Sequence, residues 1–142
     1  DIYEFFIPEV DRKKRIKGKW YNIRKPMFPG YVFISTERMK ELYEKLKNVP
    51  KLTKVLGTDH TVTPISQSEE NLIKRLTNKQ HIAEISVGYI EGDRLIISEG
   101  PMMGMEAMVK KIDRHKRIAV LSVTMFGNST DVTMGLEVLR KD

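Results

Sequence analysis

The side chains with the clearest chemical potential in this chain are cations, and they are concentrated in two short segments. Residues 12–25 hold eight lysines and arginines and no carboxylate, with Gly18, Trp20 and Tyr21 among them. Residues 110–117 hold five lysines and arginines against one carboxylate. Such groups bind phosphates, and aromatic rings offer surfaces on which bases stack. Each segment therefore indicates a nucleic-acid contact, with a solvated charged surface as the alternative.

Patterns for catalysis or metal binding are absent from the sequence. His60, His81 and His115 are far apart, no carboxylates stand at ligand spacing beside them, and cysteine does not occur. The sequence also lacks a phosphate-binding loop of the P-loop type and a dinucleotide fingerprint. We therefore expect a protein that is not an enzyme and that has neither a cofactor nor a metal site.

Charge and composition narrow the class further. The 142 residues carry 25 Lys+Arg and 19 Asp+Glu, a net charge of +6, and 40% of them are hydrophobic. The whole excess lies in residues 1–85, because residues 86–142 hold eight cations and eight anions. No apolar run reaches the roughly 18 residues of a membrane span, and the start has no signal-peptide pattern. We expect a cytoplasmic, monomeric, globular protein without membrane contact, and residues upstream of the first, which is not Met.

The elements expected in the first half alternate between strand and helix. Ser66 and Glu69 have the spacing of a capping box that opens a helix carrying Leu72, Ile73 and Leu76. The basic run reads as an exposed loop or a hairpin. The other expected elements are a short strand near the start, a buried strand over 31–34, a helix from Thr36 to before Pro50, and extended pieces at 54–56 and 61–65. This alternation predicts an α/β sandwich over residues 1–79.

A polar linker is expected at 80–86, and only strands are expected beyond it. The predicted strands are 94–97, 105–112, 118–126, 131–134 and 137–139, which together predict a small barrel over 87–142. Because so small a barrel has a minimal core, Met105, Met108 and Met125 are expected to help fill it.

Residues 92–109 resemble the KOW motif. They combine a Gly92-Asp93 turn, an apolar strand, the Gly100-Pro101 pair and Gly104 before a second strand. Gly100 and Gly104 are expected to adopt positive φ. Met102 stands where an aromatic residue is common, and we expect it to alter an exposed loop surface.

The resemblance extends over most of the chain, from Met27 to Leu139. Residues 25–34 resemble the central strand of the NusG N-terminal domain, 55–57 with 64–65 resemble its end, and 125–132 with 136–138 resemble the end of its KOW domain. The chain is thus identified as a member of the NusG family of transcription elongation factors. The implied fold is α+β: a NusG N-terminal α/β sandwich, lacking its first strand and helix, joined by a linker to an all-β SH3-like KOW barrel.

The family resemblance implies that the N-terminal domain binds RNA polymerase, at the clamp helices of the large catalytic subunit, and restrains pausing. Phe33 reads equally well as core, whereas Phe28 and Tyr31 flank a turn and are the better surface candidates. The residues at the positions matching the polymerase contact are Phe28, Pro29, Tyr31 and Phe33.

Residues 125–128 bear on the subfamily. The housekeeping factor binds a ribosomal protein or a termination factor through an Ile-Phe-Gly-Arg turn. Here Met125 and Phe126 keep the apolar part, but Asn128 replaces the arginine. Together with the cations at 110–117, this resembles the specialised LoaP group of antiterminators, which recognise a hairpin in the nascent RNA.

We therefore expect suppression of pausing and termination, with the KOW domain binding RNA. The housekeeping role is the alternative, and a ribosomal protein with a KOW domain is a third class that the polymerase-binding half disfavours. The expected RNA-binding residues are Lys110, Lys111, Arg114, His115, Lys116 and Arg117. A second set of residues is expected to contact the transcript or the DNA near the polymerase. The alternative is that this set forms a solvated loop with Trp20 packed inward. Its members are Arg12, Lys13, Lys14, Arg15, Lys17, Lys19 and Trp20.

Overall fold

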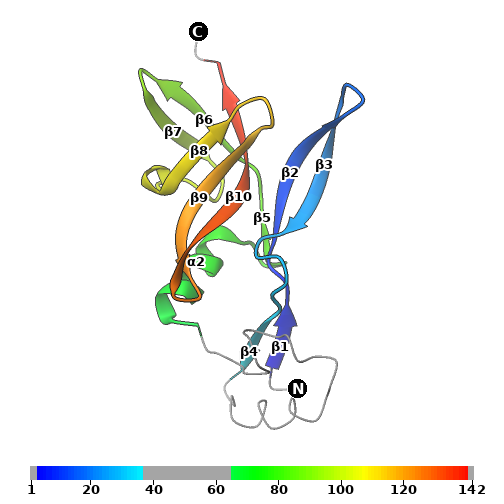
Figure 1. Cartoon of the computed structure of the whole chain (residues 1–142), viewed down its shortest axis with the longest axis vertical. Coiled ribbons are helices and arrows are strands. Elements are labelled where there is room, and N and C mark those ends of the chain that lie inside the picture. Colours follow the sequence, from blue (N-terminus) through cyan, green and yellow to red (C-terminus); the bar gives the residue numbers. More distant parts are fainter. Residues whose placement is uncertain (1–2, 37–64, 141–142) are drawn as a thin grey trace.

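A computed structural model describes residues 3–36 and 65–140 of the chain. These residues are mostly β-strand with one α-helix, an α+β composition as expected (Figure 1). The elements of the N-terminal part are β1 (Tyr3–Phe6), β2 (Glu9–Ile16), β3 (Lys19–Pro26), β4 (Phe33–Thr36), α2 (Gln67–Leu76) and β5 (Ile82–Ala83). The following elements are β6 (Ser86–Glu91), β7 (Arg94–Glu99), the 3-10 helix η1 (Glu106–Met108), β8 (Val109–Asp113), β9 (Ile118–Met125) and β10 (Asn128–Leu139).

The cationic run forms a β-hairpin, which was one of its two expected forms. β2 and β3 pair antiparallel from Glu9–Pro26 to Ile16–Lys19. Lys17 and Gly18 connect them with φ of 50° and 80°. Positive φ at both positions makes a type I′ turn, whose twist matches that of paired strands, and Gly18 adopts it without steric cost. We call β2–β3 the cationic hairpin.

The helix α2 begins as the capping box predicts. The Ser66 hydroxyl accepts the Glu69 amide at 3.2 Å, and the Glu69 carboxylate accepts the Ser66 amide at 2.8 Å. The helix buries Ile73 and Leu76, and the Thr77 hydroxyl donates to the Ile73 carbonyl at 2.6 Å where it ends. The expectation of a helix with this apolar face is confirmed.

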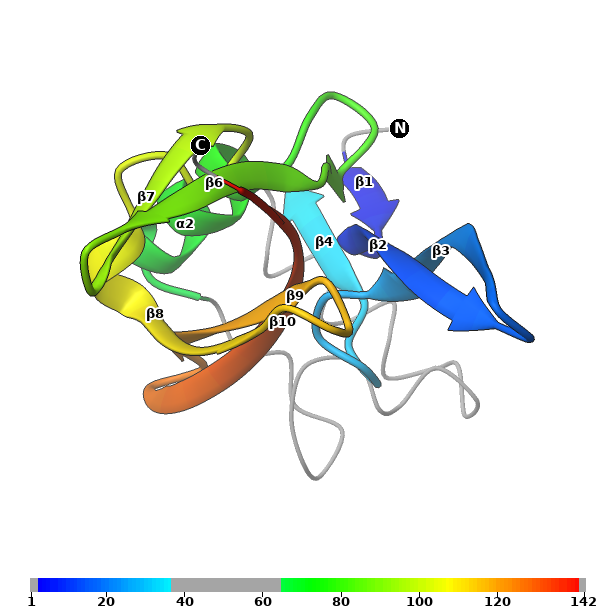
Figure 2. The ribbon, with the colours of Figure 1, turned by 90° about the horizontal axis from the view of Figure 1, so that it is seen from above.

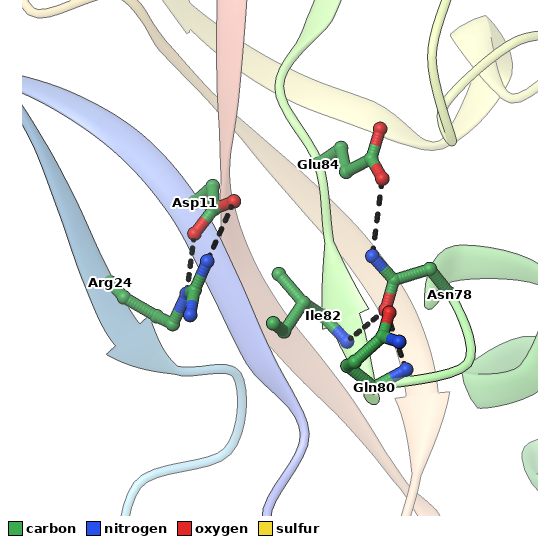
Figure 3. Close-up of polar contacts among 6 residues, drawn as sticks. All are labelled: Asp11, Arg24, Asn78, Gln80, Ile82 and Glu84. Carbon is green, nitrogen blue, oxygen red and sulfur yellow. Dashed lines mark hydrogen bonds and ion pairs between the residues drawn. The ribbon is translucent and has the colours of Figure 1, made fainter.

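The turn after α2 is organised by the side chain of Asn78. Its amide oxygen accepts the backbone amides of Gln80 and Ile82, at 2.9 and 3.1 Å, and its amide nitrogen donates to Glu84 at 3.1 Å (Figure 3). These bonds direct the chain into β5, which pairs parallel with β2. The segment expected as a linker, 80–86, therefore includes a strand of the N-terminal part.

The strands β6 to β10 form one sheet in the order β7-β6-β10-β9-β8, which we call the C-terminal sheet. β10 pairs antiparallel with β9 over 128–135 and then parallel with β6 over 136–139. The prediction of two separate strands at 131–134 and 137–139 was wrong, because one strand changes partner at Gly135 without leaving the extended conformation. The predicted strand at 105–112 begins only at Val109, because η1 occupies its first half.

The methionines fill this sheet's core only in part as expected. Met105 and Met125 are buried, but Met108 is 41% exposed because it ends η1 and points away from the core. Met102 is fully buried, so the expectation that it alters a loop surface was wrong. The Met102 amide donates to the Ser86 hydroxyl at 3.1 Å. Gly100 and Gly104 have positive φ, as predicted.

The N-terminal part and the C-terminal sheet pack against each other where β10 passes β2 (Figures 1 and 2). A Cβ atom at Gly135 would lie 2.5 Å from the Asp11 carbonyl oxygen and 2.9 Å from Ile85 Cγ1. Real Cβ atoms do not approach a backbone oxygen so closely, so the absence of a side chain at Gly135 permits the contact. We call this packed arrangement docked.

Several expected elements lie outside the described residues. They are the helix from Thr36 to before Pro50, the extended piece at 54–56, and all of the piece at 61–65 except Ile65. The buried strand expected at 31–34 begins at Phe33 instead, because Tyr31 still belongs to the preceding turn. Within the described residues, no helix is long and apolar enough to cross a membrane.

Candidate functional site

An aromatic face lies at the entry to β4, and the local sequence explains its shape. The Tyr31 amide donates to the Phe28 carbonyl at 3.2 Å, and Gly30 has a φ of 88°. Proline and then a positive-φ glycine at the two central positions make a type II turn. The turn places Phe28, Tyr31 and Phe33 side by side, and these three residues are the aromatic face.

Phe126 of the C-terminal sheet packs onto this face. Its ring stacks on Tyr31 with centroids 4.1 Å apart, meets Phe28 edge-on at 5.5 Å, and lies 6.0 Å from Phe33. Phe126 has a φ of 58° in the β9–β10 turn, with Gly127 at 76°. Positive φ is uncommon for a bulky residue. The conformation therefore costs energy, which the three ring contacts offset.

This packing changes the exposure of the residues predicted to bind polymerase. Phe28 is only 3% exposed, so the expectation that it lies on the surface was wrong for the docked arrangement, because Phe126 covers it. Phe33 is equally buried, Tyr31 is half-buried, and Pro29 is exposed. Met125, expected to share a protein-binding role with Phe126, is fully buried within the C-terminal sheet.

Glu69 holds the β9–β10 turn from the side of α2, a role that sequence reasoning missed. One carboxylate oxygen caps the helix, and the other accepts the Gly127 amide at 3.2 Å. The Ser66 amide, followed by the Gly127 and Phe126 amides, holds the pKa of this buried carboxyl below its usual range, against the opposing effect of burial. The capping box explained Glu69 locally, so nothing in the sequence indicated the second bond.

The cationic hairpin leaves most of its predicted contact residues accessible. Lys14, Arg15, Lys17 and Lys19 are exposed, whereas Arg12 and Lys13 are half-buried. Arg24 is held by Asp11, with Nε and Oδ1 2.7 Å apart (Figure 3).

Trp20 is half-buried and packs against the C-terminal sheet. The Arg117 guanidinium lies over its ring, 4.1 Å from the centroid. This distance is within the range of a favourable cation–π contact.

The second cationic segment is divided between β8 and the turn that follows it. Lys110 lies at an irregularity in the β8–β9 pairing, and its ammonium is 3.0 Å from Asp131. Lys111 is exposed on β8. Asp113 accepts the Lys116 amide at 3.0 Å and so fixes the turn. The turn exposes Arg114, His115 and Lys116, and with Arg117 they make up what we call the cationic turn.

The geometry thus brings together two pairs of segments that the sequence separates. The aromatic face meets Phe126, and the cationic hairpin meets the cationic turn through Trp20 and Arg117. Among residues 3–36 and 65–140, no three His, Cys, Asp or Glu side chains gather in a way that would hold a metal ion. Surfaces of this kind are typical of a protein that acts by binding.

Comparison with known proteins identifies the class. The model of the family described as transcription termination factor nusG matches residues 1–75, more than half of the chain. The chain therefore belongs to the NusG family and is a NusG-type transcription factor.

Similarity to individual relatives covers both parts of the chain. The Campylobacter jejuni protein named transcription termination/antitermination protein NusG is 27% identical to this chain. The alignment covers 92% of this chain and 74% of that relative. The Rickettsia felis protein of the same name is 27% identical, over 97% of this chain and 70% of the relative. The Haemophilus influenzae protein of that name is 28% identical, over 92% of this chain and 72% of the relative.

Proposed function

We propose that this chain is a transcription elongation factor that binds RNA polymerase through its N-terminal part and suppresses pausing and termination. The polymerase contact is assigned to the clamp helices of the large catalytic subunit. In this proposal residues 1–79 form the polymerase-binding domain, 80–86 the linker, and 87–142 an SH3-like KOW barrel that binds a hairpin in the nascent RNA. The role is that of a processive antiterminator of the LoaP kind.

The observation that carries the polymerase contact is the aromatic face. Its three rings accept the ring of Phe126 in stacked and edge-on geometries. A face that binds an aromatic side chain from elsewhere in the chain has the shape and apolarity to bind one from another protein. The same face cannot hold both at once, so polymerase binding through it requires the β9–β10 turn to leave.

The RNA contact is supported by the cationic turn. Arg114, His115 and Lys116 project from a hairpin loop whose backbone is fixed by Asp113. Arginines on such a loop reach phosphates, stack on unpaired bases and contact base edges. Asn128 replaces the arginine of the housekeeping turn. Its side-chain amide donates to the Phe126 carbonyl at 3.4 Å, a hydrogen bond within the β9–β10 turn.

Two measurements on the full chain test this function. Tyr31→Ala is expected to weaken capture of the chain by RNA polymerase, while Tyr21→Ala, an exposed tyrosine outside the face, leaves capture unchanged. Arg114→Ala/Lys116→Ala is expected to weaken binding of structured RNA in a gel shift. The charge-matched control is Arg94→Ala/Arg140→Ala, because both of its arginines are exposed away from the turn. Equal behaviour of variants and controls would reject the corresponding contact.

A protein partner on the C-terminal sheet is the second candidate, and the conformation of Phe126 favours it. The ring projects from a two-residue turn and becomes available when the sheet leaves the aromatic face. Co-purification of a ribosomal protein or a termination factor that depends on Phe126 would support this function over RNA binding.

A further inference from the structure

We propose that the tip of the cationic hairpin and the cationic turn form one composite surface that binds the sugar-phosphate backbone of a structured RNA. The composite surface comprises Arg15, Lys17 and Lys19 of the hairpin with Arg114, Lys116 and Arg117 of the turn. This inference rests on the proposed RNA-binding role of the turn and extends it to a segment far away in the sequence.

The contact between Trp20 and Arg117 places the two sets of cations together. Trp20 is the cross-strand partner of Arg15 and directly follows Lys19. The guanidinium that lies 4.1 Å above its ring belongs to the residue after Lys116. Cross-strand partners share one face of a hairpin, so Arg15 lies beside Trp20 on the side that meets Arg117. Lys17 and Lys19 at the tip, and Lys116 next to Arg117, lie within a few residues of this contact.

The backbone near Gly135 fixes this arrangement. The Leu136 amide donates to the Arg117 carbonyl at 3.0 Å, so the end of the cationic turn is bonded to β10. One residue earlier, Gly135 lies against the backbone of Asp11 and Arg12 in β2. The same short stretch of β10 therefore holds the turn and abuts the hairpin, and docking builds the composite surface.

The charges of this surface are largely uncompensated. Residues 12–25 contain no carboxylate, and the Asp11 carboxylate is bound to Arg24 further along the hairpin. In the turn, Asp113 is one carboxylate against the three cations Arg114, Lys116 and Arg117, and one of its oxygens accepts the Lys116 amide. Cations brought together without anions repel one another, and a chain of phosphates removes that repulsion while releasing its own counterions. The matching partner is a polyanion with charges along a line, which is the chemistry of a nucleic-acid backbone.

The test uses the full chain and a fluorescently labelled RNA hairpin with a fully paired stem, with affinity measured by anisotropy across a salt series. Lys17→Ala/Lys19→Ala removes two hairpin-tip cations from exposed positions, one in the turn and one at the start of β3. Its charge-matched control is Lys74→Ala/Lys79→Ala on and after α2. The tip variant is expected to lose about tenfold in affinity at moderate salt, and its log–log salt slope is expected to fall by about two.

Gly135→Ala tests whether docking builds the surface. It keeps every cation, but its new Cβ forces β10 from β2, so we expect a loss similar to that of Lys17→Ala/Lys19→Ala. Because the tip no longer contributes, combining the two changes is expected to cause little further loss. Full additivity would overturn the composite surface. An unchanged circular dichroism spectrum of the Gly135→Ala variant shows that its sheet has folded. If that variant does not fold, the composite surface is tested by Lys17→Ala/Lys19→Ala alone.

The outcomes separate this inference from the proposed function. If the tip variant matches its control while Arg114→Ala/Lys116→Ala still loses affinity, the composite surface is overturned and RNA binding by the turn stands. If neither loses affinity, both fall. Equal binding of a DNA hairpin of the same sequence, or equal competition by polyglutamate, would overturn the assignment to RNA.

Discussion

Replacing Phe126 with alanine is expected to release the β9–β10 turn from the aromatic face. The ring of Phe126 contacts Tyr31, Phe28 and Phe33 at centroid distances of 4.1, 5.5 and 6.0 Å. Aromatic pairs contribute about 0.5–1.5 kcal/mol each beyond the area they bury, so three pairs contribute about 3 kcal/mol. Since 1.4 kcal/mol is a factor of ten in an equilibrium constant, the turn should open roughly 100-fold more often.

The Gly127 amide reports this opening. It donates to the Glu69 carboxylate across the contact, whereas the amides of the β9–β10 ladder are bonded within the C-terminal sheet. Amide hydrogen exchange measured by nuclear magnetic resonance follows the population of the open state. In Phe126→Ala we therefore expect Gly127 to exchange roughly 100-fold faster, with the ladder amides unchanged.

Met108→Ala is the matched control, because it removes an exposed apolar side chain from η1, directly before β8, without touching the aromatic face. Its Gly127 exchange should equal that of the unchanged chain. The reasoning is refuted if Phe126→Ala leaves Gly127 exchange unaltered. It is also refuted if the ladder amides accelerate equally, since the sheet itself would then be unfolding.

Three further predictions concern stability. Ser66→Ala should destabilise the fold by about 1 kcal/mol through loss of the cap of α2, as measured by urea denaturation. Gly92→Ala should destabilise the fold by about 1 kcal/mol, because Gly92 has a positive φ and open space around it. Gly100→Ala should destabilise it more, because Gly100 also has a positive φ and its new Cβ would lie 2.6 Å from Ser86. The pKa of Glu69 is lowered in the fold, so its stabilisation is present above the ordinary pKa of about 4.3 and is lost as the pH falls through the lower folded value. Thermal unfolding of Glu69→Gln should therefore depend less on pH in that acidic range than that of the unchanged chain.

The features that could be predicted from the sequence are those fixed by a few neighbouring residues. The capping box at Ser66 and Glu69 needs only residues three apart, and the positive φ of Gly100 and Gly104 follows from local turn geometry. The apolar run of β9 is likewise recorded in its own residues. Family resemblance supplied the order of the elements and located the aromatic face.

The remaining features depend on partners that are distant in the sequence. β10 is continuous because it changes from β9 to β6 at Gly135, and no local pattern records such a change. Phe28 is buried by a ring almost a hundred positions away, and the contact of Trp20 with Arg117 spans a similar distance. Composition and periodicity describe the faces of an element but not what covers them.

The docked arrangement determines how another protein can displace Phe126 from the aromatic face. The C-terminal sheet is attached at both ends of the β9–β10 ladder, by Phe126 at one end and by Gly135 with Arg117 at the other. Eight paired residues separate these ends, which corresponds to roughly 25 Å. Two linked contacts behave as a bivalent tether, in which each keeps the other at a high effective concentration. A protein that binds the aromatic face can therefore displace the C-terminal sheet in two steps. In the intermediate, Phe126 has left the aromatic face while the cationic hairpin and the cationic turn are still in contact.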